Sequence, residues 1–440
     1  MTASRELAPT RLIEVPVDPL LAVAAVARLA RPPFVVYERA GTWVLAAGAR
    51  VRLRMDGTGI AVTTPAGQRR VPLTAQPLRQ VAEVLAEAGT EPWRAYGWAA
   101  FELARLLHLG HADGPLLDLV VPAYELVIGP DGVREHGTAP EGVAEAMRAA
   151  ASQSWPGPAA DLTDPDALDE DYLTAVRATV RDIQAGDADK VILSRVVPVD
   201  GEIDFPATYV AGRRGNTPAR SFLLDLGGLR ATGFSPETVV EVDPAGRVST
   251  RPLAGTRALV GDPDLDLATR RELLGDPKEI FEHAISVKLA QDELAAVCAP
   301  DSVRVEEFMT VRERGSVQHL ASRVRGELAD GRTAWDAFAA LFPSITASGI
   351  PKAAAVSAIG RNEPRRGLYS GAVLTVDSDG ALDAALVLRT VFSAGGQTWL
   401  RAGAGVIALS TPEREWTETC EKLRSISRFL VPAQVRGAAG

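Results

Sequence analysis

The sequence predicts an α+β fold, in which runs of antiparallel strands are interspersed with a few long helices. Three observations support this class. Short strand-like apolar runs follow one another after about residue 165. Two of these runs are joined by the turn-like sequence Ser378-Asp379-Gly380, which is typical of an antiparallel hairpin. Two long helical patterns carry their own start signals.

The first 150 residues predict helices and strands in mixed order. The apolar run at 20–30 is too short to span a bilayer and predicts a packed helix. Residues 34–55 predict strands with a turn at Ala40-Gly41, and the apolar spacing at 77–89 and 96–109 predicts two helices. A stretch at 151–171 that is rich in Pro, Ser, Ala and Asp marks a weak boundary.

The remaining chain predicts most of the strands and the two longest helices. One helix should begin at Pro277 after the N-cap Asp276 and end near Val297, and another should run from Pro412 to about Leu430. Strands are expected at residues 190–197, 221–226, 238–243, 371–377, 381–392 and 398–408.

Composition excludes several classes of protein. Of the 440 residues, 46% are hydrophobic and 23% charged, which is ordinary for a soluble globular protein. The net charge of −9 argues against general nucleic-acid binding, which requires clustered Lys and Arg. Cys298 and Cys420 lack a metal-ligand spacing, and the N-terminus lacks a signal-peptide pattern. We therefore expect a cytoplasmic protein that binds no membrane.

Acidic residues recur on one side of each long helix. Glu279 and Glu282 are three residues apart, and Glu415, Glu418 and Lys422 share one face by the same rule. Carboxylates from two helices can meet a hard divalent cation such as Mg²⁺. Solvated ion pairs explain the same spacing, and from spacing alone they are the more common outcome.

Two features of the last strands attract interest. Arg389 interrupts an apolar run and needs a carboxylate partner, which either the protein or a ligand can supply. The segment 401–408 contains a G-x-G-x-x-A pattern, but it continues as a strand, so we reject a dinucleotide site. Its glycines indicate either a close approach to a ligand or a tight crossing within a sheet.

Other residues have mainly structural interpretations when they are considered singly. Lys190 begins a buried strand, although lysine usually lies in water. Glu237 follows Ser-Pro and is expected in a turn, while Gly255 and Thr256 are expected in a loop. His319 lies in an apolar context that is typical of a core histidine.

Together these segments resemble the chorismate-utilising enzymes, which include the anthranilate, aminodeoxychorismate, isochorismate and salicylate synthases. The resemblance covers residues 165–432 densely, and the N-terminal part is similar to the siderophore-pathway salicylate synthases. It rests on ten ordered motifs: DKVILSR, GFSPE, RPLAGTR, EIFEHAI, SVQHL, TASGIPK, RGLYSGAV, LRTVF, RAGAGV and ETCEKL. It implies two large antiparallel sheets packed face to face with helices outside. Residues 1–160 and 165–435 would then be parts of one folded unit.

The resemblance also implies a role for each matching residue. Glu282 and Glu418 would bind Mg²⁺, with Glu279 and Glu415 nearby, and Glu237 would be a general acid whose pKa is raised by burial or by carboxylate charge. His319 would help to hold the ring carboxylate of chorismate. The enolpyruvyl carboxylate would bind Arg389 and Tyr369, and further substrate contacts would come from Gly255, Thr256, Gly403, Ala404, Gly405 and Lys422.

Two positions favour one branch of the family. Lys190 stands where water-using members have a general base, and Thr346 in SITASGIPK is similar to the salicylate type. We therefore expect a salicylate synthase that adds water at C2 of chorismate, releases the C4 hydroxyl and then eliminates pyruvate. An isochorismate synthase is the main alternative, followed by an amine-using synthase and a non-catalytic chorismate-binding protein. We expect a monomer that needs no glutaminase subunit.

Overall fold

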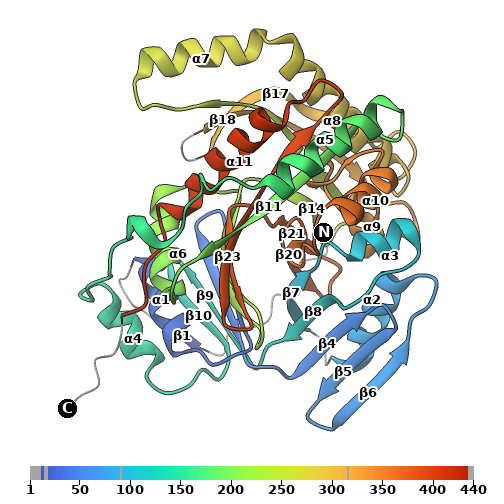
Figure 1. Ribbon diagram of the computed structural model, residues 1–440. Helices are drawn as coiled ribbons and strands as arrows, with labels where there is room; N and C mark the ends of the chain where they lie inside the picture. Colours follow the sequence, from blue (N-terminus) through green and yellow to red (C-terminus); the bar gives the residue numbers. More distant parts are fainter. Residues whose placement is uncertain (1–10, 14–17, 90–91, 315–316, 435–440) are drawn as a thin grey trace.

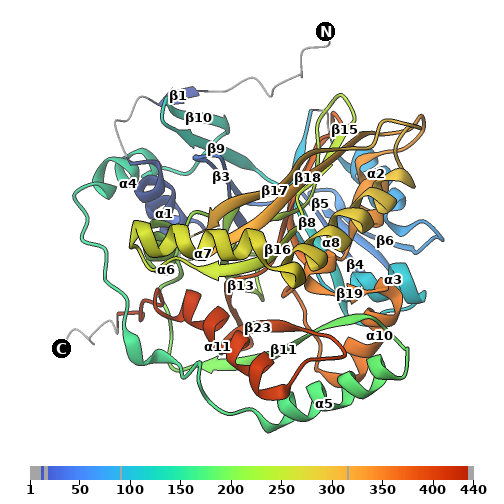
Figure 2. The same cartoon turned by 90° about the horizontal axis from the view of Figure 1, so that it is seen from above.

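The computed structural model describes residues 11–13, 18–89, 92–314 and 317–434 (Figure 1). Two large antiparallel sheets pack face to face, and helices cover their outer surfaces and one end (Figures 1 and 2). The predicted α+β class is therefore confirmed. Residues 1–10, part of the region assigned to 1–160, lie outside the described residues, as do Ser316 of the SVQHL motif and Val435.

The first sheet contains eleven strands over the described residues. In spatial order they are β1 (Arg11–Ile13), β10 (Gly132–Gly137), β9 (Tyr124–Gly129), β3 (Thr42–Ala47), β2 (Phe34–Arg39), β12 (Arg220–Asp225), β13 (Arg230–Ser235), β22 (Thr390–Ala394), β23 (Gln397–Val406), β11 (Lys190–Val199) and β19 (Gly349–Ile350).

The second sheet contains twelve strands over the described residues. In spatial order they are β16 (Leu253–Ala258), β18 (Val317–Glu327), β15 (Arg247–Thr250), β14 (Thr238–Val242), β21 (Leu382–Leu386), β20 (Ala372–Asp377), β7 (Arg94–Ala99), β8 (Pro115–Val121), β4 (Val51–Asp56), β5 (Gly59–Thr64) and β6 (Gly67–Pro72), with β17 (Arg304–Arg314) paired to β18.

The helices fall into three groups by what they cover. The first sheet is covered by α1 (Pro19–Leu29), α4 (Val143–Ala150) and α6 (Phe205–Gly215). The second sheet is covered by α2 (Pro77–Ala88), α3 (Leu103–Leu109) and α9 (Ala334–Leu341), while α10 (Lys352–Asn362) packs on α3 and on β11 and β19 of the first sheet. The end drawn at the top of Figure 1 carries α5 (Glu170–Gln184), α7 (Pro263–Gly275), α8 (Pro277–Ala295) and α11 (Pro412–Ser427).

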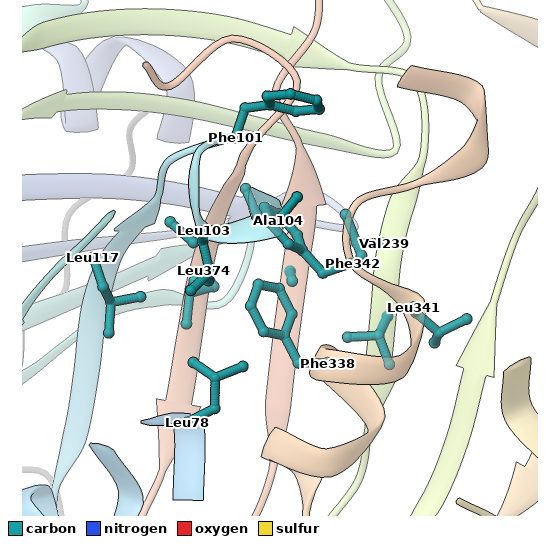
Figure 3. Packing of buried hydrophobic residues seen from close by; sticks show 14 of the residues in the cluster. Leu78, Phe101, Leu103, Ala104, Leu117, Val239, Phe338, Leu341, Phe342 and Leu374 are labelled. Carbon is teal, nitrogen blue, oxygen red and sulfur yellow. The ribbon is translucent and has the colours of Figure 1, made fainter. Parts of the chain in front are cut away.

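Three clusters of apolar side chains hold the sheets and helices together, one between the sheets and one on the outer side of each sheet. Tyr96, Phe222 and Phe392 belong to the cluster between the sheets. On the outer side of the second sheet, Phe338 lies close to Leu374 in the close view (Figure 3). Burial of each such side chain stabilises the fold by about 1.5–3 kcal/mol, so this core fixes the strands that carry the site.

Several predicted elements are confirmed with small changes in their ends. The run predicted at 20–30 forms α1 (Pro19–Leu29), residues 77–88 form α2, and the Ser378-Asp379-Gly380 turn joins β20 to β21. The helix α8 begins at Pro277 as predicted, with the Asp276 side chain accepting hydrogen bonds from two backbone N–H groups. Both long helices end two or three residues before the predicted position.

Two predicted elements are wrong in part. Residues 96–109 form the strand β7 and then α3 rather than one helix, because both faces of β7 are buried and the continuous apolar run hides its period. Residues 381–392 form two strands, β21 and β22, which belong to different sheets. The chain crosses between the sheets at Arg389, whose φ of 51° ends the extended conformation.

The strands of both halves of the chain are combined in each sheet. In the first sheet β2 pairs with β12, and in the second sheet β7 pairs with β20. The assignment of residues 1–160 and 165–435 to one folded unit stays a prediction, which these pairings support. Within the described ranges, no helix has both the length and the apolar character needed to cross a membrane.

Candidate active site

A cavity of about 140 Å³ lies where the two sheets meet the end covered by α8 and α11. Its walls come from β16, β18, β23, α11 and the chain crossing at Arg389. Eight predicted site residues line it: Glu237, Thr256, His319, Thr346, Tyr369, Arg389, Gly403 and Lys422. The other six lie outside its lining: Lys190, Gly255, Ala404, Gly405, Glu282 and Glu418.

Glu237 is a buried acid rather than a turn residue in water. Its side chain and backbone are only 2% exposed, because Glu237 leads into β14 inside the second sheet. Burial raises the pKa of its carboxyl to about 7, although the hydroxyl groups of Ser344 and Thr346 oppose this shift. Ser344 donates a hydrogen bond of 3.0 Å to Oε1. Oε2 has no hydrogen-bond partner among the described residues, so this carboxyl can hold a proton near neutral pH.

Arg389 is a half-buried cation that forms no ion pair with the described residues. Its guanidinium contacts the ring of His319 at 3.3 Å, and no carboxylate of the described residues lies within ion-pair distance. Burial, followed by the charge of Arg314, lowers its pKa to about 10, so it remains charged at neutral pH. The sequence left open whether Arg389 binds a carboxylate of the protein or one of a ligand. This geometry favours a carboxylate of a ligand.

His319 connects Arg389 to Thr256. Its Nε2 faces the Arg389 guanidinium, which can only donate, and its Nδ1 lies 2.8 Å from the Thr256 hydroxyl oxygen. Burial, helped by the charges of Arg389 and Lys422, lowers the pKa of His319 to about 3. The ring is therefore neutral, accepts at Nε2 and carries its proton on Nδ1. It can orient Arg389 but has no charge with which to bind an anion.

Gly255 and Thr256 lie in a strand rather than in the predicted loop. They belong to β16, which has an irregularity in its pairing with β18 between Ala254 and Thr256. Gly255 has a φ of 82°, which favours glycine, and a Cβ there would lie 3.1 Å from Glu279. The Thr256 hydroxyl lies 2.8 Å from Nδ1 of His319 on the neighbouring strand β18.

Gly403 and Gly405 lie in β23 and are packed against two predicted site residues. The strand pairs with β11 through Val406, which is inconsistent with a dinucleotide turn and agrees with its rejection. A Cβ on Gly405 would lie 2.8 Å from Cε of Lys190, and a Cβ on Gly403 would lie 3.1 Å from the Tyr369 hydroxyl oxygen. Tight packing therefore accounts for both glycines, and Ala404 between them is fully buried.

Lysines join the cavity to the carboxylates of α8 and α11. Lys422 donates to the Gly403 carbonyl at 2.8 Å and to Glu418 at 2.7 Å. Lys190, the first residue of β11, lies 3.3 Å from Glu282, and its side chain is 19% exposed. Burial raises the pKa of Glu418, but the charges of Lys422, Lys190 and Lys278 outweigh it and lower the pKa overall. Lys190 is thus close to both carboxylates.

The donor set of Glu282 and Glu418 fits a magnesium ion. Mg²⁺ prefers one or two carboxylates and takes its other ligands from water and substrate oxygens. The two side chains are 25% and 41% exposed, so a hydrated cation can reach them. Over the described ranges no three acidic, histidine or cysteine side chains group closely enough to hold a metal. Glu279 is engaged by Arg257 at 3.2 Å, and burial followed by the charge of Glu418 raises the pKa of Glu415.

The structure adds two residues that the sequence did not single out. Ser344 contacts Glu237 and begins the SITASGIPK segment, so its hydroxyl two residues before Thr346 was an available signal. Arg314 ends β17, and its charge acts on both Arg389 and His319. It follows other charged residues in VRER, which is an ordinary surface pattern, so no sequence signal distinguished it.

Comparisons with known proteins agree with this architecture. The profile of the chorismate binding enzymes matches residues 33–428. The chain is 42% identical to a salicylate synthase of Mycolicibacterium paratuberculosis over 98% of both chains. It is 43% identical to an anthranilate synthase component 1 of Streptomyces coelicolor over 56% of this chain and 48% of that protein.

Solved structures share the fold at low sequence identity. The anthranilate synthase component I of Streptococcus pneumoniae superposes with a TM-score of 0.73 at 21% identity and covers 97% of this chain and 95% of its own. The menaquinone-specific isochorismate synthase of Escherichia coli gives a TM-score of 0.71 at 20% identity, over 97% and 96% of the two chains. These likenesses bear out the two-sheet fold.

Proposed function

The chain belongs to the family of chorismate-binding enzymes, and from this premise we propose that it is a magnesium-dependent salicylate synthase. The observation that carries the proposal is the 42% identity to a salicylate synthase over nearly the whole length of both chains. The anthranilate synthase similarity covers only about half of either protein. The proposed substrate is chorismate, which carries two carboxylates, a leaving hydroxyl and an enolpyruvyl ether.

Two cations bind the substrate in this proposal. Arg389, which pairs with no carboxylate of the described residues, takes the enolpyruvyl carboxylate together with the hydroxyl of Tyr369. The neutral ring of His319 holds the Arg389 guanidinium in place through Nε2. The ring is itself held by the Thr256 hydroxyl at Nδ1. Lys422, fixed by Glu418 and the Gly403 carbonyl, supplies a second positive charge to the cavity.

Acid and base act at separate places. Glu237 gives its proton to the departing C4 hydroxyl, since burial keeps that carboxyl protonated near neutral pH. Lys190, which lies 3.3 Å from Glu282, takes a proton from the water that attacks C2. A Mg²⁺ ion held by Glu282 and Glu418 would stabilise negative charge on the ring carboxylate.

Pyruvate elimination follows in the same cavity. It transfers the hydrogen at C2 to the enolpyruvyl methylene as the ether bond breaks, so it depends on positioning more than on a further catalyst. Thr346, which lines the cavity and acts on Glu237, is proposed to hold the ring for this step.

The purified chain should be tested with chorismate and Mg²⁺ in the absence of a glutaminase. Pyruvate release, followed with lactate dehydrogenase, should rise together with salicylate fluorescence. Isochorismate that accumulates without pyruvate would identify an isochorismate synthase instead. Unchanged chorismate would indicate a protein that only binds it.

A further inference from the structure

A second and larger cavity opens between the sheets, away from the catalytic one. It is a groove of about 760 Å³, and none of the predicted site residues lines it. One wall is the inner side of β4 and β5, where Val51 and Leu53 belong to the core under the helices, Arg52 and Arg54 line the groove, and Met55 borders both. Figure 1 shows β4–β6 extending beyond the first sheet, which leaves this side uncovered.

The groove is positively charged although the protein is acidic. Five arginines and two aspartates line it, namely Arg52, Arg54, Arg70, Arg365, Arg366, Asp56 and Asp118. Arg365 and Arg366 pair with Glu102 at 3.7 Å and Glu363 at 2.6 Å outside the lining, so the groove keeps one excess positive charge, in a chain whose net charge is −9. A groove of one sign between low-dielectric walls concentrates ions of the other sign.

The individual ion pairs show which arginine is available. Arg52 pairs with Asp118 at 2.7 Å and Arg70 pairs with Asp56 at 2.6 Å. Arg54 is exposed and pairs with no carboxylate of the described residues. Its guanidinium therefore offers a planar set of donors that suits a carboxylate or a phosphate.

The opposite wall of the groove is aromatic. Phe392 and Trp399 stack with their ring centroids 5.7 Å apart and their planes at 20°. Trp98 of β7 lines the groove from the second sheet, the sheet that also holds β4 and β5, and its indole Nε1 has no hydrogen-bond partner among the described residues. Aromatic faces favour a flat ring, and a buried indole N–H without an acceptor is uncommon in a native structure.

We propose that this groove is a second ligand site, which binds a small anion that carries a planar ring. The anion meets Arg54, and the ring lies against the aromatic wall. Its volume is within the usual range for small-molecule sites. Two stacked side chains separate the groove from the catalytic cavity. Arg366 lines the groove, Tyr369 lines the cavity, and the Arg366 guanidinium lies 5.7 Å from the centre of the Tyr369 ring.

The site can be tested by calorimetric titration of the full chain with two probes, salicylate and adenosine monophosphate. The probes share a ring and a negative charge, but one presents a carboxylate and the other a phosphate. Binding is measured in an Arg389→Gln background, which removes the unpaired cation of the catalytic cavity. The second site rests on the proposed function only for the choice of salicylate as a probe. Because no turnover is measured, the second site and the proposed activity can fail separately.

At least one probe should bind the Arg389→Gln protein with one molecule per chain. The further change Arg54→Glu should weaken this binding about tenfold or more, because it removes a charge-assisted contact and adds repulsion. Arg134→Glu, at an exposed arginine of β10 outside the groove, should leave the binding unchanged. Arg54→Gln is a second variant, which removes the positive charge without adding a negative one. Both variants should fold, because Arg54 forms no ion pair with the described residues that the change could break.

Two results would overturn the proposal. One is that neither probe binds the Arg389→Gln protein. The other is that Arg54→Glu and Arg134→Glu bind the probes equally well. Preference for salicylate or for adenosine monophosphate decides which kind of anion the groove accepts.

Discussion

The substitution Glu237→Gln should make the protein more stable above neutral pH while it abolishes turnover. Glutamine keeps the shape of the side chain but cannot ionise. In the parent, burial raises the pKa of Glu237 from 4.5 to about 7. At about 1.4 kcal/mol for each pKa unit, this shift corresponds to about 3 kcal/mol of free energy of unfolding.

The sign of this effect follows from proton binding. The folded parent holds the Glu237 proton more tightly than the unfolded chain, so its stability is highest below the unfolded pKa and falls as pH rises through about 7. The Gln variant lacks this dependence. The difference in unfolding free energy should therefore change by about 3 kcal/mol in favour of the variant between about pH 4.5 and about pH 8.

Urea unfolding of both proteins at several pH values measures this difference. Glu145→Gln is the matched control, because it makes the same chemical change at a side chain on α4 that is 70% exposed. If the unfolding free energies of the parent and of Glu237→Gln change in parallel with pH, the raised pKa of Glu237 is refuted. The parent's kcat should also decline above about pH 7, as the acid loses its proton.

Four further predictions address the rest of the site. Arg389→Gln should lower kcat/KM by about ten- to hundredfold with little loss of stability. Arg220→Gln removes the bidentate partner of the buried Asp383, which keeps only Arg39 at 3.4 Å as an ion-pair partner, and should cost about 3 kcal/mol of stability; equal destabilisation would contradict the unpaired state of Arg389. Gly405→Ala should reduce kcat, since its Cβ would lie 2.8 Å from Cε of Lys190, while Gly275→Ala, with open space around it, should be neutral in the same assay. Lys190→Gln should stop hydration of chorismate in a product assay; hydration at the parent rate would remove Lys190 as the base. Chelation with EDTA should abolish turnover and Mg²⁺ should restore it; full activity without metal would rule out the role of Glu282 and Glu418.

Local patterns predicted much of the fold because they act over a few residues. The cap at Asp276 and the hairpin turn at 378–380 are short-range signals, and both were confirmed. The strand β7 was missed because its two faces meet different cores, which removes the alternation that identifies a strand. The break at Arg389 was missed because a positive φ at arginine has no sequence signature.

The site depended on distant parts of the chain. The sequence alone gave Glu237 an exposed turn and His319 a place in the core, and only the family resemblance gave them chemical roles. Burial and the shared contacts with Ser344 and Arg389 appear only after the sheets have packed. The pairing of Lys190 with Glu282 joins residues 92 positions apart, which no local pattern encodes.

The central claim is that one chain adds water to chorismate and then releases pyruvate. Product analysis by mass spectrometry, after incubation with chorismate and Mg²⁺ in heavy-oxygen water, tests both steps at once. Salicylate whose phenolic oxygen is heavy, formed in equal amount with pyruvate, is the predicted result. Heavy isochorismate without pyruvate, an aminated product when ammonia is supplied, or salicylate without the heavy atom would contradict it.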